Sequence, residues 1–195
     1  MKFHDPLDSL LSSTSRVRVL RLLLQFPGTT FTGREVARLC AISPSQALTA
    51  LDGLRLDGLA GRQAAGRAYL WSLVRTHTLF EPLEALFRAD RHAMDSLRDL
   101  IRDRLRGVPV RRAVIFGSLA RGDERPGSDI DLFVELRSNS RRGEVEIALG
   151  KLRSEILARF GNILSPLVYT RRESIRPPNP ALLEAIDSEG LSVVG

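Results

Sequence analysis

The sequence predicts a mixed α/β (α+β) chain in which two small domains are joined by a long helix. Residues 1–76 contain apolar side chains at helical spacing and end in two short segments that are joined by a glycine-rich turn. Residues 78–106 hold one sustained helical repeat, and residues 129–136 alternate between apolar and polar side chains, as a β-strand does. The expected divisions are 1–76 for the first domain, 77–107 for the connecting helix and 108–195 for the second domain.

The composition is typical of a soluble globular protein. Its 195 residues contain no apolar run near the ~20 residues of a membrane helix. The first ten residues, "MKFHDPLDSL", carry acids where a leader peptide would be basic and apolar. The single cysteine, Cys40, excludes an internal disulfide and a cysteine-based zinc site. We therefore expect a cytoplasmic protein without membrane association.

The net charge of +6 is concentrated in the first third of the chain. Residues 1–76 have ten Lys and Arg against five Asp and Glu, whereas residues 108–195 have thirteen against twelve. This asymmetry favours a polyanionic partner for the first domain. A solvated arginine-rich surface is the alternative explanation, because the chain contains only two lysines.

Three helices are expected before the first hairpin. The first covers 16–25, with Ser15 as its N-cap, and "FPG" ends it. Thr32 caps a short second helix, and Ser43 followed by Pro44 begins the third. The side chains expected to face the core are Val36, Ala37, Leu39, Cys40, Leu48, Leu51 and Leu54.

The third helix runs to Asp57, and the segment "LAGRQAAGRAYLWSLV" at 59–74 follows as a hairpin. This order of elements, with "TGREVARLCAISPSQALTALDGLRLDGL" and "GRQAAGRAYL", resembles the winged helix-turn-helix family of DNA-binding regulators over residues 7–76. The resemblance implies transcription regulation and double-stranded DNA as the partner, with the third helix in the major groove. Bases would be read by Ser45, Gln46 and Thr49, and phosphates would be contacted by Arg55, Arg62 and Arg67. A protein-docking role for the same three-helix core stays open.

The long helical segment has two interpretations. Its apolar positions recur at helical spacing, namely Phe80, Leu83, Phe87, Met94, Leu97 and Ile101. They could pack a connecting helix onto both domains, or they could form the seam of a homodimer.

The second domain is expected to be a small mixed sheet with helices. Its strands are "RRAVIF" at 111–116, the alternating 129–136 and "NILSPLVYT" at 162–170, the last an edge strand because it contains Pro166. A helix at 141–160 precedes the third of these strands, and a helix at 180–187 with a short strand "LSVVG" completes the domain.

Two carboxylates lie on one face of the second strand. Asp129 and Asp131 are two residues apart, which places their Cα atoms about 6.5–7 Å from each other. Such a pair is suited to Mg²⁺, which binds few protein carboxylates and completes its shell with water and phosphates. Upstream, Gly117 allows close backbone approach to a phosphate, and Ser118 and Arg121 supply donors.

The spacing Gly117-Ser118, ten residues, Asp129, one residue, Asp131 resembles the polymerase-β-like nucleotidyltransferases, in particular their minimal members, over about residues 108–170. The resemblance implies that Asp129 and Asp131 hold Mg²⁺ (or Mn²⁺) and that Gly117, Ser118 and Arg121 bind an NTP, with ATP expected. Asp129, Asp131 and Ser118 would be the catalytic residues. A hydroxyl would attack the α-phosphate while pyrophosphate leaves.

The chain departs from that family at the third strand. Full members carry a third carboxylate there, and here no acid lies between Gly161 and Arg172; the equivalent position is near Ser165. Three functions therefore stay open. The first is a DNA-binding regulator with a Mg-nucleotide-binding, nucleotidyl-transferring domain. The second is an antitoxin-like enzyme, as in toxin–antitoxin systems, that AMPylates a partner protein and uses the winged helix for autoregulation. The third is a catalytically inactive interaction module.

Overall fold

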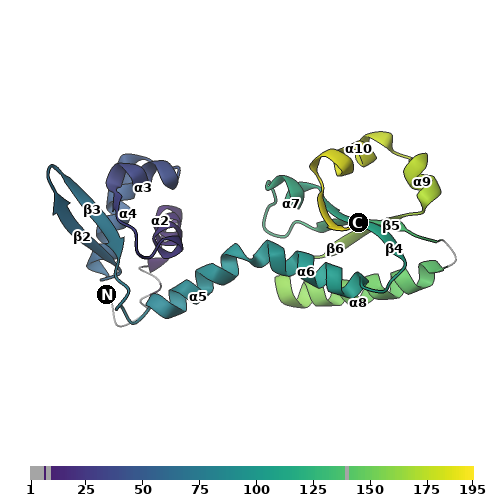
Figure 1. Ribbon diagram of the computed structural model, residues 1–195, viewed down its shortest axis with the longest axis horizontal. Coiled ribbons are helices and arrows are strands. Elements are labelled where there is room, and N and C mark those ends of the chain that lie inside the picture. The colour runs from purple at the N-terminus through teal and green to yellow at the C-terminus, as the bar shows by residue number, and fades with distance from the viewer. Residues whose placement is uncertain (1–6, 8–9, 139–140) are drawn as a thin grey trace. The chain divides into compact units, whose positions relative to one another are not determined.

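The computed structural model describes residue 7 and residues 10–138 and 141–195, so most of the N-terminal stretch used above lies outside the described residues. The chain forms two compact units, Met1–His92 and Ala93–Gly195 (Figure 1). Both units combine helices with a small sheet, which confirms the α+β class. The functional divisions expected at 76 and 107 stay predictions. No helix in the described part of the chain has the length and apolar run needed to cross a membrane.

In its described residues, unit 1 has three helices, a hairpin and a further helix in the order expected from the sequence, with a short strand at Phe31–Thr32 in addition. Its elements are α2 (Thr14–Gln25), β1 (Phe31–Thr32), α3 (Gly33–Leu39), α4 (Pro44–Leu56), β2 (Ala60–Ala65), β3 (Ala68–Leu73) and α5 (Phe80–Arg91). The strands form an antiparallel sheet in the order β1-β3-β2. One apolar core with Trp71 and Leu51 at its centre joins all of these elements.

Side-chain caps define the helix starts in unit 1. Ser13, not the expected Ser15, caps α2 by accepting a hydrogen bond from the Arg16 N–H. Thr32 begins α3 and Ser43 begins α4 as expected, each in a reciprocal capping box with the residue three positions later. These caps satisfy amide groups that have no partner within the helix.

Two expected core residues are exposed. Leu39 and Leu48 keep 49% and 46% of their surface accessible, so their assignment to the core was wrong. In α4 the buried face is formed by Ala47, Ala50, Leu51 and Leu54. A single step along a helix turns the side chain by about 100°, so Leu48 points away from the face that its neighbour Ala47 occupies.

A buried ion pair explains a glycine in the middle of α4. Arg16 on α2 reaches Asp57 just beyond α4 at 3.2 Å, and both side chains are nearly buried. The guanidinium lies directly on Gly53, where an added Cβ would come far inside 3.0 Å of it. Gly53 therefore provides space for the ion pair at the expense of local helix propensity.

The expected long helix is divided in two. α5 ends at Arg91, His92 is in a turn, and α6 (Ala93–Leu105) follows. The buried side chains of α5 belong to the core of unit 1, and those of α6 belong to the main core of unit 2. Each half of the apolar pattern thus serves its own unit.

Unit 2 is a four-stranded mixed sheet with helices on both faces. After α6 come β4 (Val110–Phe116), α7 (Ser118–Arg121), β5 (Ile130–Leu136), α8 (Arg142–Phe160), β6 (Leu164–Tyr169), α9 (Arg171–Ile175), α10 (Pro180–Glu189) and β7 (Leu191–Val194). The strand order is β6-β5-β4-β7, with only β5 and β6 parallel. α6 and α8 cover one face, while α9 and α10 lie on the other (Figure 1). α9 was not expected, although its capping sequence Thr-x-x-Glu at Thr170 was readable.

β6 is an edge strand, as Pro166 predicted. Because the Ile130 N–H donates to the Ile163 carbonyl, the parallel pattern turns the backbone groups of Leu164, Pro166 and Val168 toward the open side. Pro166 therefore lacks its N–H where that group would face outward. This arrangement weakens further strand pairing at the edge.

Candidate functional site

Three strand ends bring the polar residues of unit 2 together. In the sheet register, Phe116 at the end of β4 pairs with Asp131 on β5, and Asp131 pairs with Ser165 on β6. Gly117 follows β4 directly, and Asp129 precedes β5 directly. The carboxylates share the sheet face that carries Phe133, whereas Ile130 and Leu132 belong to the core on the opposite face.

Gly117 has a backbone conformation that only glycine adopts readily. Its φ of 74° and ψ of −151° lie in a region nearly closed to L side chains. A Cβ at Gly117 would also lie well inside 3.0 Å of the Asp131 carboxylate. The sharp turn therefore brings the backbone before Ser118 directly against one of the two carboxylates.

A second turn positions the start of β5. Arg125 and Ser128 bond to each other through backbone and side chain at 2.9 and 3.0 Å, across Pro126 and Gly127. Gly127 has a φ of 85°, and Pro followed by such a glycine is the pattern of a type II turn. Asn162 donates from its side chain to the Ser128 carbonyl at 2.9 Å, which anchors this loop to the start of β6. Nothing in the local sequence around Asn162 indicates this role, because it depends on a contact 34 positions away.

The environment raises the pKa of Asp131. Partial burial is the main cause and the negative charge of Asp129 adds to it, while Arg121 opposes the shift. A cation between the two carboxylates would offset both effects by favouring the charged form of Asp131. The donor set fits a metal such as Mg²⁺, which takes few protein carboxylates and completes its shell with water and phosphate oxygens. In the described part of the chain, no group of three or more His, Cys, Asp or Glu side chains could hold a metal, so Asp129 and Asp131 are the carboxylates available here.

Ser165, near which the resemblance predicted a third carboxylate, lies next to the carboxylate pair. It lies beside Asp131 in the sheet register, and its hydroxyl donates to Asp129 Oδ2 at 2.9 Å. The sequence located the missing acid near Ser165 but did not reveal this hydrogen bond. A hydroxyl thus lies directly against the carboxylate pair.

Arg121 lies close to the site but already has acidic partners. Its guanidinium is 3.3 Å from Asp123 and 3.7 Å from Glu189 at the end of α10. These are exposed ion pairs and contribute little stability. A phosphate could therefore displace either acid at small cost.

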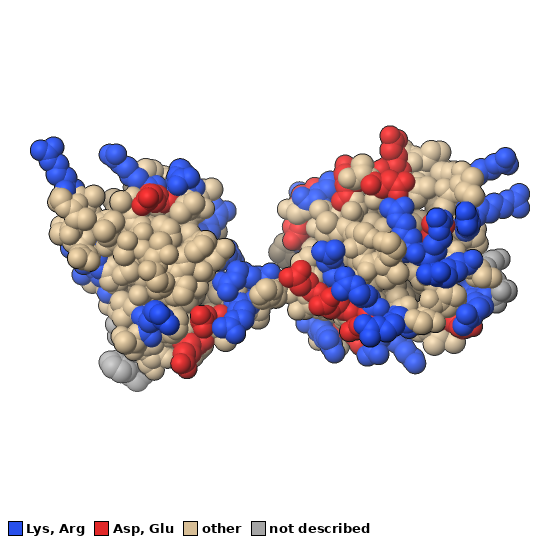
Figure 2. Space-filling view, viewed as in Figure 1, with Lys and Arg blue, Asp and Glu red and all other residues tan. Residues whose placement is uncertain are grey.

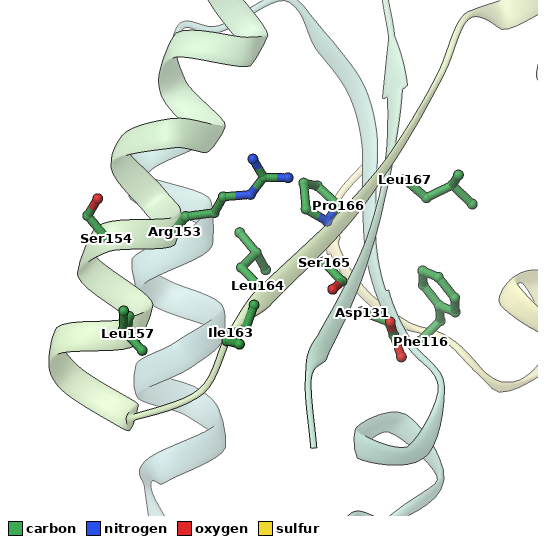
Figure 3. Close-up of a pocket in the computed structure, with 10 residues that line it drawn as sticks. All are labelled: Phe116, Asp131, Arg153, Ser154, Leu157, Ile163, Leu164, Ser165, Pro166 and Leu167. Atoms are coloured by element: carbon green, nitrogen blue, oxygen red, sulfur yellow. The ribbon is translucent and has the colours of Figure 1, made fainter. Parts of the chain in front are cut away.

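A cavity of about 660 Å³ is lined by Asp131 and by residues of β6 and α8. Figure 3 shows Asp131 and Ser165 on one side of β6 and Arg153, projecting from α8, on the other. Leu157 and Ile163 line the cavity and are more than half exposed. An acceptor of mixed character could therefore enter beside Ser165.

The α4 residues expected to contact DNA differ in whether their side chains already make local hydrogen bonds. Ser45, Gln46 and Thr49 all lie on the exposed side of α4, but the Gln46 side chain accepts from the Ser43 N–H and the Ser45 hydroxyl bonds to Ser43. Thr49 has no such local role among the hydrogen bonds of the described residues.

The three arginines expected to contact phosphates differ in their contacts within the protein. Arg62 stacks over Tyr69 at 4.2 Å and lies 3.7 Å from Asp52, which Arg55 contacts as well. Arg67 follows Gly66 in the exposed turn of the hairpin. Figure 2 shows Lys and Arg spread over the visible face of unit 1 with few acidic side chains among them.

Comparisons with known proteins give partial matches. Reduced HlyU from Vibrio cholerae N16961 is 20% identical, with 46% of this chain and 84% of that chain covered and a TM-score of 0.36. A toxin–antitoxin structure with AMP-PNP is 19% identical, with 50% and 73% covered and a TM-score of 0.35. A possible transcriptional regulator from Methanosarcina mazei Go1 is 13% identical, with 49% and 86% covered and a TM-score of 0.35. Likeness at this level does not extend to function.

The search of curated proteins found no match. A family model does match part of unit 2. Residues 94–172, from α6 to the start of α9, match the family described as a nucleotidyltransferase domain, and this segment contains the Gly-Ser turn, both aspartates and Ser165.

Proposed function

We propose that unit 2 binds a nucleoside triphosphate with Mg²⁺ and transfers its nucleotidyl group to a hydroxyl, and that unit 1 binds double-stranded DNA. The protein would then be a DNA-binding regulator with a nucleotidyltransferase domain. The observation that carries the enzymatic part is the close approach of the Gly117 turn to Asp131. That approach puts a phosphate-binding backbone beside a carboxylate that a cation would stabilise.

Each residue of the site would have its own role in this reaction. Asp129 and Asp131 would hold Mg²⁺ (or Mn²⁺), which neutralises the phosphate charge as pyrophosphate leaves. The N–H and hydroxyl of Ser118 would bind phosphate oxygens, and Arg121 would exchange its exposed acidic partners for a phosphate. The acceptor hydroxyl would approach from the cavity beside β6, opposite the Gly117 turn.

Calorimetric titration with Mg·ATP tests the nucleotide site. We expect the wild-type chain to bind and the Asp129→Ala/Asp131→Ala double variant to lose binding, because no carboxylate pair remains for the metal. Ser154→Ala is the matched control, since Ser154 lines the same cavity from α8 without a place in the proposed phosphate or metal contacts. Equal binding by the double variant and the wild type would overturn the assignment.

DNA binding by unit 1 is tested by its dependence on salt. We expect Arg67→Ala to weaken binding to a duplex from the chain's own upstream region and to reduce the salt slope by about 1, the effect of losing one phosphate contact. Arg88→Ala is the control, because Arg88 is an exposed α5 arginine paired with Glu84. Salt-independent binding, or an unchanged slope for Arg67→Ala, would exclude this DNA interface. Arg62 is a poor probe because its stacking on Tyr69 also supports the hairpin.

A hydroxyl on a partner protein is the second candidate acceptor, as in an antitoxin-like enzyme that AMPylates its partner. The exposed Leu157 and Ile163 beside the cavity favour it, because they offer apolar contact area next to the reacting groups. α-labelled ATP, Mg²⁺ and the product of an adjacent gene, incubated together, should yield a labelled partner only with intact Asp129 and Asp131. Nucleotide binding without any transfer would instead identify an inactive nucleotide sensor.

A further inference from the structure

We propose that Ser165 is itself an acceptor, so that the chain attaches a nucleoside monophosphate to its own Ser165. This inference rests on the proposed nucleotide site. It is carried by the hydrogen bond of 2.9 Å from the Ser165 hydroxyl to Asp129 Oδ2, at the strand position where a third carboxylate was expected. A nucleophile thus replaces an acid directly beside the carboxylate pair.

The arrangement of the groups suits in-line attack. The Gly117 turn ends β4, the carboxylates begin β5, and Ser165 lies on β6, the neighbour of β5 on its other side. β5 lies between β4 and β6, and neighbouring strands are about 4.8 Å apart. The phosphate turn and the serine therefore flank the carboxylates from opposite sides. With the β- and γ-phosphates at the turn and the α-phosphate at the carboxylates, pyrophosphate would leave on the side away from the Ser165 oxygen.

The step balances with the NTP as its only co-reactant. Ser165 Oγ forms a bond to the α-phosphorus, and the bond from the α-phosphorus to the bridging oxygen of the β-phosphate breaks. Pyrophosphate carries away the electron pair of that bond. The hydroxyl proton is released to bulk water through the open cavity that Ser165 lines. The product is a Ser165 phosphodiester to the nucleoside, adjoining the cavity that Ser165 lines.

Other hydroxyls nearby are less suited to attack. Tyr169 is buried and stacks edge-on against Phe133 at 5.5 Å, four positions further along β6. The Thr170 hydroxyl is bonded to Glu173 in the cap of α9. Ser154 is on α8, and its hydroxyl bonds to the Gly150 carbonyl. Ser165 is the hydroxyl that donates to a carboxylate of the proposed metal site.

Incubation of the full chain with Mg·ATP, and then with each other NTP in turn, tests this inference by mass spectrometry. We expect a gain of one nucleoside monophosphate. Trypsin would place the modification on the peptide Phe160–Arg171, and fragmentation must assign it to Ser165 rather than Tyr169 or Thr170. Label in the α-phosphate should be retained and label in the γ-phosphate lost, which distinguishes nucleotidyl transfer from phosphorylation. Ser165→Thr should keep the label, Ser165→Ala should lose it, and Ser154→Ala should label as the wild type does.

Mg·ATP binding, measured in parallel, separates the two possible failures. If the wild-type chain binds Mg·ATP but its Ser165 stays unmodified with every NTP, the self-modification is refuted and the nucleotide site stands. If it neither binds nor becomes labelled, the proposed function fails as well. Label that maps to another residue, or that persists in Ser165→Ala, also overturns the inference.

Discussion

Replacing Gly117 with alanine tests the geometry on which the nucleotide site depends. Two separate costs are expected. A non-glycine residue at φ 74° and ψ −151° is strained by about 1–3 kcal/mol. The new methyl group would also overlap Asp131 Oδ2, so the carboxylate must move away from the position that Gly117 leaves to it. A shift of about 1 Å at a reacting centre costs about 100-fold in reaction rate, equivalent to about 2.7 kcal/mol of activation free energy, and the displaced carboxylate should also weaken Mg·ATP binding.

Gly122→Ala is the matched control for this experiment. Gly122 also has a positive φ, 71° with ψ 24°, but a Cβ there would meet no atom within 4 Å. We expect a left-handed alanine there to cost about 1–2 kcal/mol of stability without affecting the carboxylates. Urea unfolding should therefore show comparable losses for both variants, whereas calorimetry with Mg·ATP should show weakened binding only for Gly117→Ala. Wild-type affinity in a folded Gly117→Ala protein would refute the proposed role of this turn.

Two further perturbations give expected outcomes. Burial and the charge of a neighbouring carboxylate raise the pKa of Asp131, so its charged form is disfavoured by folding and the metal-free protein should lose stability as pH rises through that pKa. Asp131→Asn should consequently raise the thermal midpoint of unfolding in EDTA at pH 7. It should not raise the midpoint below pH ~3.9, where the carboxyl is protonated in both the folded and the unfolded state. The Mg²⁺ affinity of the wild type should fall at acidic pH, because protons compete with the metal for Asp131. An unchanged midpoint at pH 7 would contradict this. Gly53→Ala should destabilise unit 1 by about 2 kcal/mol, because loss of the Arg16–Asp57 ion pair outweighs the ~1 kcal/mol that alanine normally adds to a helix. Gly150→Ala, in open space on α8, should stabilise by about that ~1 kcal/mol in urea unfolding, and a stabilised Gly53→Ala protein would disprove the packing argument.

Features coded by neighbouring residues could be predicted from the sequence. Ser43 before Pro44 marked the start of α4, and the alternation over 129–136 identified β5, with Asp131 on its polar face and Asp129 directly before it. Such signals are readable because capping and strand alternation involve residues only one to three positions apart. The same locality explains the error at Leu48. Helical spacing shows that a helix has an apolar face. Whether a residue at the border of that face, such as Leu48, is buried depends on the elements that pack against the helix.

Contacts between residues far apart in the sequence could be identified only from the tertiary structure. The sequence alone determined the α+β class, the order of the elements apart from β1, α9 and the division of the long helix, the Gly-Ser turn with its two aspartates, and the absence of a third acid near Ser165. Only the structure showed that Ser165 bonds to Asp129 across 36 positions, that Arg121 contacts Glu189, and that Arg62 stacks on Tyr69. Strand register and side-chain packing set these contacts, and both depend on which distant segments the buried apolar surface brings together.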